Sequence, residues 1–184
     1  MKPVDVARVA VLAVCVLAAG VFGGWQGWRT ATVAPPAPPP VCPLVRPEIF
    51  TLLAPGHGPL RTEQGQAPGE RWNYCIAEGE TGADGRRGEL AVGVTRYGRS
   101  GGRGPSCLAR DGLRPALNRQ NHPVALGDAA VYWLEGSPDT GRVLRLTACS
   151  GTYRVAVEYA ATGIGDAAIV EAAVAVGQEV LAKL

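Results

Sequence analysis

The sequence predicts an α+β protein, in which an N-terminal transmembrane helix precedes a mainly antiparallel sheet of about five strands with a C-terminal helix packed on one face. Three observations predict this: an uncharged stretch of membrane-spanning length, several segments with the alternation of strands, and a final segment with helical periodicity. We expect a cytoplasmic N-terminus (1–8), an anchor (9–28), a proline-rich extracytoplasmic linker (29–41) and one disulfide-linked domain (42–184).

The anchor is predicted from "VAVLAVCVLAAGVFGGWQGW", residues 9–28, which carries no formal charge. As a helix this segment is about 30 Å long, the thickness of one hydrocarbon core. Cationic groups precede it within 1–8, and Trp25 and Trp28 stand at its far end, where indole rings favour the headgroup region. We therefore expect a single-pass membrane protein with the domain outside the cell.

This segment has three other interpretations. A cleaved signal peptide has a candidate cleavage site in "LAAG" at 17–20, and a lipoprotein would use Cys15, but Val14 stands where that motif has a small residue. The apolar run continues past both positions. A buried core helix is disfavoured because the proline run separates the segment from the rest of the chain. Retention or cleavage stays open.

The linker contains five prolines in "TATVAPPAPPPVC", residues 30–42. Proline has no backbone donor and a fixed φ, so the segment is expected to form a solvated polyproline II rod. At ~3.1 Å per residue, Thr30 to Val41 would reach up to roughly 35 Å. The domain would then stand well above the membrane.

Four cysteines follow the anchor: Cys42, Cys75, Cys107 and Cys149. They allow three disulfide connectivities, among which the sequence does not choose, and we favour Cys42–Cys75 with Cys107–Cys149. A metal site is the alternative, but no cysteines are closely spaced and neither histidine lies beside one. No metal and no cofactor are expected.

The elements of the domain are expected in this order. "RPEIFTLLAPG" (46–56) predicts a short helix, because proline stands at its first position and Pro55-Gly56 ends it. Helical turns are expected within 107–121. Alternating apolar residues predict the strands at 71–78, 88–97 and 128–135, and a hairpin over 142–160 around Ser150-Gly151.

The last segment, 166–184, has the pattern of an amphipathic helix. Asp166 is expected to cap it. Its apolar residues recur at helical spacing, at Ile169, Ala173, Val176, Val180 and Leu184.

This layout resembles the actinobacterial secreted and lipoprotein domain families of unknown function. The similarity covers 42–184 and rests on "CPLVRPEIFTLLAPG", on the cysteine of "WNYCIAE", on "ALGDAAVYW", and on the final hairpin and helix. It implies an α+β domain outside the membrane with no assigned activity. This chain departs from the pattern in lacking a lipobox and in carrying Cys107 and Cys149.

A hydrolase motif is present but in an unfavourable context. "GRSGG" (98–102) matches G-x-S-x-G, and Ser100, Asp111 and His122 follow in hydrolase order. A nucleophile elbow needs a helix after the serine, whereas "GRGPSC" is typical of a loop. Asp128 is expected to form a turn rather than to act as an acid. We therefore do not expect an enzyme.

Arginine is concentrated between residues 86 and 119, where eight arginines face only Glu89 and Asp111. A solvated face is one explanation, and a docking surface for anions is the other. The predicted surface comprises Arg96, Arg99, Arg103, Arg110 and Arg114. Its expected ligand is an anionic lipid, a wall polymer or an envelope protein; a net charge of +2 gives no indication of nucleic-acid binding.

The sequence is compatible with three functions. The favoured one is a membrane-anchored extracytoplasmic binding module in a bacterial envelope, since sixteen arginines against two lysines are typical of GC-rich bacteria. The second is an accessory subunit of a membrane complex, with the glycine-rich anchor packed on partner helices. The third is an envelope hydrolase that uses Ser100.

Overall fold

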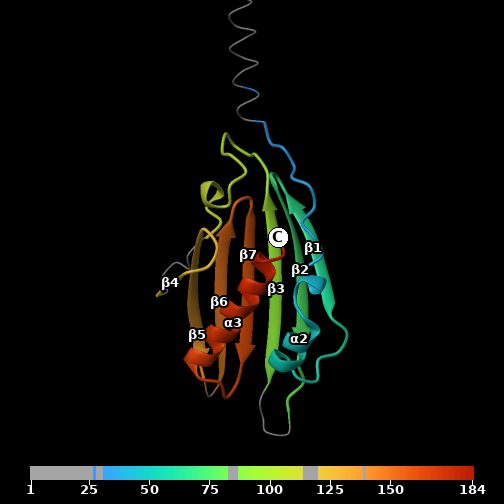
Figure 1. Ribbon diagram of the computed structural model, residues 1–184, viewed down its shortest axis with the longest axis vertical. Helices are drawn as coiled ribbons and strands as arrows, with labels where there is room; N and C mark the ends of the chain where they lie inside the picture. The colour runs from blue at the N-terminus through green and yellow to red at the C-terminus, as the bar shows by residue number, and fades with distance from the viewer. Residues whose placement is uncertain (1–26, 28–30, 83–86, 114–119, 139) are drawn as a thin grey trace, which may run out of the picture.

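The computed structural model of the chain describes residues 27, 31–82, 87–113, 120–138 and 140–184 (Figure 1). The expected anchor at 9–28 lies outside the described residues, apart from Gly27. No helix in the described ranges is long and apolar enough to span a membrane. The described part is thus the expected domain together with residues 31–41 of the linker.

One antiparallel sheet of seven strands forms the centre of the molecule, in the spatial order β1-β2-β3-β7-β6-β5-β4. The strands are β1 (Arg61–Ala67), β2 (Glu70–Glu78), β3 (Gly88–Tyr97), β4 (His122–Val124), β5 (Ala129–Ser137), β6 (Gly141–Ser150) and β7 (Tyr153–Ala161). Two meanders, β1-β2-β3 and β4-β5-β6-β7, are joined by the pairing of β3 with β7. β3, β7 and β6 therefore lie in the middle of the sheet, and they bury more residues than the other strands do.

Five of these strands, β2, β3, β5, β6 and β7, are confirmed from the alternating pattern. The two edge strands were not predicted. β1 has the largely exposed sequence RTEQGQA, which offers no apolar alternation. β4 has three residues and contains Pro123, which only an edge strand tolerates. The sheet is thus larger than expected because its edges bury too little to leave a pattern.

The hairpin between β6 and β7 closes one residue later than expected. Ser150 pairs with Tyr153, so Gly151 and Thr152 form the turn. Gly151 has a φ of 55°, the left-handed conformation that such turns need and that glycine adopts without strain. Asp128 Oδ2 accepts a hydrogen bond from the Gly151 N–H at 2.7 Å. Asp128 therefore supports this turn instead of bonding to its own backbone.

Two helices cover one face of the sheet (Figure 1). α2 (Pro47–Leu53) packs against β3, and α3 (Asp166–Leu181) packs against β6 and β7. Two short 3₁₀ turns, η1 (Cys42–Leu44) and η2 (Leu108–Arg110), complete the elements. The predicted apolar face of the last helix is confirmed for Ile169, Ala173, Val176 and Val180, which are buried. The helix ends at Leu181, so Leu184 lies beyond it.

The core lies between these helices and the sheet. Its largest fully buried side chains come from α2, α3, η1 and its flanks, and the central strands: Phe50, Leu90, Leu144, Leu146, Ile169, Val41, Val45, Val92, Val94, Val155, Val157 and Val176. On the other face, the rings of Trp72 and Tyr74 lie over Gly65 and Gly93, where a Cβ atom would come within 2.4 and 2.3 Å of them. Glycine at these positions lets the rings lie flat on the sheet.

The N-terminus of α3 differs from the expectation. Gly165 occupies the cap position, and no side chain caps the helix. Asp166 is instead the first helical residue and pairs with Arg142, whose Nε donates to Oδ1 at 2.7 Å. This hydrogen bond lowers the pKa of Asp166. A carboxylate in the first turn still interacts favourably with the helix dipole.

Two disulfides are present, with the favoured connectivity. Cys42–Cys75 joins η1 to β2 across a Cα–Cα distance of 5.1 Å, and Cys107–Cys149 joins the loop before η2 to β6 across 5.5 Å. Cys75, Cys107 and Cys149 are fully buried. One bond therefore fastens the start of the domain to the sheet, and the other fastens the arginine-rich loop.

Residues 31–41 pack against the domain. The Asn73 side chain donates hydrogen bonds to the carbonyls of Pro38 (2.9 Å) and Pro39 (3.1 Å). Three residues of the segment are buried: Pro35, Pro38 and Val41. The expectation of a solvated rod is therefore wrong for these residues, because proline carbonyls still accept hydrogen bonds and the sheet supplies a donor.

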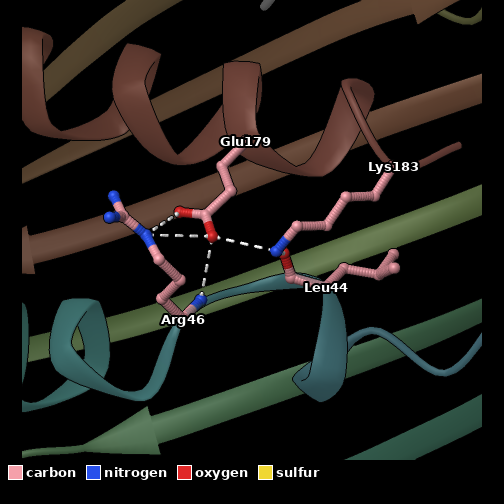
Figure 2. Close-up of polar contacts among 4 residues, drawn as sticks. All are labelled: Leu44, Arg46, Glu179 and Lys183. Carbon is pink, nitrogen blue, oxygen red and sulfur yellow. Dashed lines mark hydrogen bonds and ion pairs between the residues drawn. The ribbon is translucent and has the colours of Figure 1, made fainter.

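Polar contacts tie the start of the domain to α3 (Figure 2). The Glu179 carboxylate accepts hydrogen bonds from the Arg46 backbone N–H (3.1 Å), Arg46 Nε (3.3 Å) and Lys183 Nζ (3.0 Å). Lys183 Nζ also donates to the Leu44 carbonyl at 2.8 Å. Burial raises the pKa of Glu179, but the hydrogen bonds from Lys183 and Arg46 outweigh burial, so its pKa lies below the ordinary value.

We expect Glu179→Gln to lower the free energy of unfolding at pH 7 by about 1–3 kcal/mol, since the 13% exposed side chain loses charge-assisted hydrogen bonds. A carboxyl with a depressed folded-state pKa stabilises the fold above its unfolded pKa and loses that contribution as pH falls through the folded value. The difference between wild type and variant should therefore shrink below about pH 4. Urea titrations at pH 7 and in acid measure it; an equal difference at both would contradict a role for the charge.

Candidate functional site

The arginines of the predicted anionic surface lie at one end of the sheet, where β2 begins and β3 ends, at the top in Figure 1. The described members are Arg96, Arg99, Arg103 and Arg110. Arg114 lies outside the described residues. The structure adds Arg71, which is opposite Arg96 in the register of β2 and β3. We call Arg71, Arg96, Arg99, Arg103 and Arg110 the arginine end.

Two of these side chains have neighbours that orient them without burying them. The Arg96 guanidinium lies 5.3 Å from the centre of the Tyr153 ring, a cation–π arrangement. Arg103 Nη1 lies 2.6 Å from Asp111 Oδ2, and both side chains are more than half exposed. An exposed pair of this kind contributes little to stability and can exchange partners. Both arginines therefore remain able to bind an external anion.

Arg110 has a different role. Its Nη1 donates to the Ser100 carbonyl at 2.9 Å, and its guanidinium lies 5.9 Å from the Tyr97 ring centre. The side chain is half-buried, and its Nε is shielded from solvent. Arg110 thus holds the loop in place, which residue type and spacing alone did not indicate.

The loop that carries the arginines is fixed to the sheet. The disulfide attaches Cys107 to β6, and the Cys107 N–H donates to the Gly151 carbonyl at 2.8 Å. Ser100 and Arg103 form a small antiparallel bridge through two backbone hydrogen bonds. A covalent bond and backbone pairing therefore set the positions of the arginines.

The N-terminal segment reaches the domain at this same end. The Val33 N–H donates to the Arg99 carbonyl at 2.9 Å, and the Thr32 hydroxyl lies 3.5 Å from the Ser100 hydroxyl. Gly98 makes room for this approach, because a Cβ there would lie 2.2 Å from the Val33 carbonyl oxygen. The chain therefore enters the domain beside the arginines.

Apolar side chains are exposed near the arginines. Among the described residues, three large hydrophobic side chains are exposed: Val33 (55%), Leu108 (45%) and Leu52 (76%). Val33 contacts Arg99 through its backbone, and Leu108 begins η2 in the same loop. Leu52 lies apart, on α2. The arginine end thus combines cationic and apolar surface.

Positive and negative side chains are unevenly distributed between the two ends of the sheet. In the half that includes the arginine end, arginines outnumber acids: Arg71, Arg96, Arg99, Arg103, Arg110 and Arg154 against Glu70, Asp111 and Asp128. In the opposite half acids predominate: Glu63, Glu78, Glu80, Glu89, Glu135, Glu158 and Asp166 against Arg61, Arg87, Arg142 and Arg145. The domain therefore has a positive and a negative end.

The residues of the hydrolase motif have separate surroundings. Ser100 bonds to the Arg103 backbone, Asp111 pairs with Arg103, and His122 stacks on Tyr132 with ring centres 5.0 Å apart. Among the described residues, no hydrogen bond joins Ser100 to Asp111 or to His122. Asp111 and His122 are therefore not bonded to Ser100 in the way that a catalytic triad requires.

The other histidine also has local contacts. His57 Nδ1 lies 2.7 Å from the Gly58 carbonyl oxygen, and its ring packs against the edge of Phe50. In the part of the chain that the structure describes, no group of His, Cys, Asp and Glu is placed to hold a metal ion.

A groove of about 770 Å³ lies between α3 and β5, which sequence reasoning did not anticipate. Its apolar lining comes from both elements: Tyr132, Leu134, Ala167, Val170 and Val174. The Arg142–Asp166 pair also lines it, and each of those charges satisfies the other. The groove leaves Tyr132 and Leu134 half-buried, and the alternating sequence of β5 gives no sign of it.

The resemblance to secreted actinobacterial domains stays an expectation that rests on short motifs. Comparisons with family models, with curated proteins and with solved structures find no match.

Proposed function

We propose that this chain is a membrane-anchored extracytoplasmic binding module whose arginine end binds an anionic ligand. The observation that carries the proposal is the placement of Arg96 at the end of β3 and of Arg99 and Arg103 on the loop that follows it, which is fixed to the sheet. Guanidinium groups donate paired hydrogen bonds to phosphate and carboxylate oxygens, so this chemistry suits an anion. The two disulfides support an oxidising compartment outside the cytoplasm.

Binding is better supported than catalysis by the contacts of the same loop. The Ser100 backbone holds the loop through Arg103 and Arg110, and among the described residues no hydrogen bond joins the Ser100 hydroxyl to a histidine. Arg96 and Arg103, in contrast, have an aromatic and an exposed partner, respectively, and both partners leave the guanidinium groups accessible. The accessory-subunit function depends on the anchor, which lies outside the described residues.

We expect the full chain, in nanodiscs of phosphatidylcholine, to bind inorganic polyphosphate, and Arg96→Gln/Arg99→Gln/Arg103→Gln to weaken that binding by about tenfold or more. Wild-type binding should also weaken as salt rises, because the Debye length falls from ~10 Å at 0.1 M to ~3 Å at 1 M. Fluorescence anisotropy of labelled polyphosphate measures both effects.

The matched control is Arg61→Gln/Arg87→Gln, which removes exposed arginines from the opposite end of the sheet. It should leave polyphosphate affinity nearly unchanged. Neither variant should shift the unfolding midpoint much, because none of these arginines is fully buried and surface ion pairs contribute little to stability. Equal weakening by both variants would sink the proposal, as would absence of binding to polyphosphate and to anionic lipid alike.

A further inference from the structure

We infer that the ligand of the arginine end is the anionic lipid surface of the membrane that holds the chain's own anchor. The domain then docks on that membrane instead of standing away from it. This inference rests on the proposed function, because it names the ligand of the same site.

The path from the expected anchor to the arginine end is short. The anchor is expected to end at Trp28, and Thr32 is already in contact with Ser100. Four residue steps span at most about 14 Å, even when fully extended. This is comparable with the Debye length of ~10 Å at 0.1 M salt. While the segment stays docked, the arginines therefore remain within electrostatic reach of the headgroups.

The proline-rich segment lies beside the domain and adds no distance from the membrane. From Val33, hydrogen-bonded to Arg99, it runs along the sheet past Asn73 to η1 and α2 (Figure 1). Asn73 alternates with Cys75 in β2, so the segment covers the face that also carries the helices. A free rod of this length would reach roughly 35 Å. Because the segment runs alongside β2, it does not hold the domain at that distance from the membrane.

The mixture of side chains at this end favours lipid over a hydrated polymer. Val33 and Leu108 are exposed beside the arginines, although exposed apolar groups are costly in water. A lipid surface presents phosphate groups that bind guanidinium groups. Beneath them lies an apolar region in which Val33 and Leu108 can be buried. A soluble wall polymer would engage the charges and leave Val33 and Leu108 in water.

The charge distribution gives the docked domain one orientation. An anionic surface attracts the positive end and repels the half of the sheet in which Glu78, Glu89 and Glu135 lie. The point of chain entry places that positive end towards the anchor. The covalent link to the anchor and the electrostatic attraction therefore both orient the arginine end towards the membrane.

The test compares the full chain in nanodiscs of phosphatidylcholine with the same chain in nanodiscs that also contain phosphatidylglycerol. With phosphatidylglycerol, amide exchange in residues 98–111 should slow several-fold. Affinity for polyphosphate should fall by about fivefold for each arginine engaged by lipid, because the two anions compete. High salt should remove the difference in amide exchange between the two nanodiscs.

Two pairs of variants make the test specific. Arg99→Gln/Arg103→Gln should abolish the lipid-dependent slowing, whereas Arg61→Gln/Arg87→Gln should not. Val33→Ser/Leu108→Ser should reduce it, whereas Leu52→Ser, at the remaining exposed apolar site among the described residues, should leave it unchanged.

The outcomes separate the two proposals. Polyphosphate binding with equal affinity and equal exchange in both nanodiscs would overturn the inference and leave the proposed function standing. No polyphosphate binding together with no lipid effect would overturn both. Slowed exchange without polyphosphate binding would support lipid as the ligand. Failure of the chain to incorporate into nanodiscs would contradict the expected anchor and would overturn the inference.

Discussion

Replacing Cys42 and Cys75 together by alanine is expected to lower the free energy of unfolding by about 4 kcal/mol. The bond closes a loop with a sequence separation of 33, and opening it returns conformational entropy to the unfolded chain. The variant should also raise the slope of a urea titration somewhat, because the unfolded chain without this cross-link is less compact and exposes more surface. Circular dichroism of the full chain in detergent measures the shift.

The second disulfide provides the control for this prediction. Cys107→Ala/Cys149→Ala opens a loop with a separation of 42, so its global effect should also be about 4 kcal/mol. Local effects should differ: the first variant should speed amide exchange in η1, and the second in the loop that carries the arginine end. A loss below about 1 kcal/mol for either pair, or the same local pattern for both, would contradict the roles assigned to them.

The strands that the sequence reveals are those with one face buried against helices. In β7, Val155, Val157 and Tyr159 are buried and the residues between them are not, which is a clear period of two. β1 is polar along its length, and β4 is too short to show any period. The N-terminus of α3 was misassigned because Asp166 has both a suitable position for capping and an arginine within reach, and sequence does not show the arginine.

The candidate site was predictable only in part, for a similar reason. Arginines clustered along the chain are visible in the sequence, but the pairing of Arg71 with Arg96 depends on strand register. The structural role of Arg110 depends on where the Ser100 carbonyl points. The docking of the proline-rich segment depends on a single side-chain donor, Asn73, which nothing in that segment specifies. At the start of the segment, Thr32 and Val33 lie beside the arginine end.

Phe50→Ala is expected to lower the free energy of unfolding by about 3–5 kcal/mol, through lost burial and the cavity left behind. α2 has seven residues, too few for a helix to be stable by itself, so contacts with the core must hold it. Phe50 is 1% exposed and is the largest side chain that this helix buries. Since a domain is stable by only about 5–15 kcal/mol, this is a large share of the total.

Leu52→Ala is the control on the same helix. Leu52 is 76% exposed, so its substitution should change stability by no more than about 0.5 kcal/mol. α2 follows Arg46, which Glu179 holds, so loosening the helix should also loosen the segment before it. Phe50→Ala, but not Leu52→Ala, should therefore speed exchange of the Val33 amide at the arginine end. Equal urea midpoints for the two variants would show that the disulfide and Glu179, not the buried face of α2, hold this part of the chain.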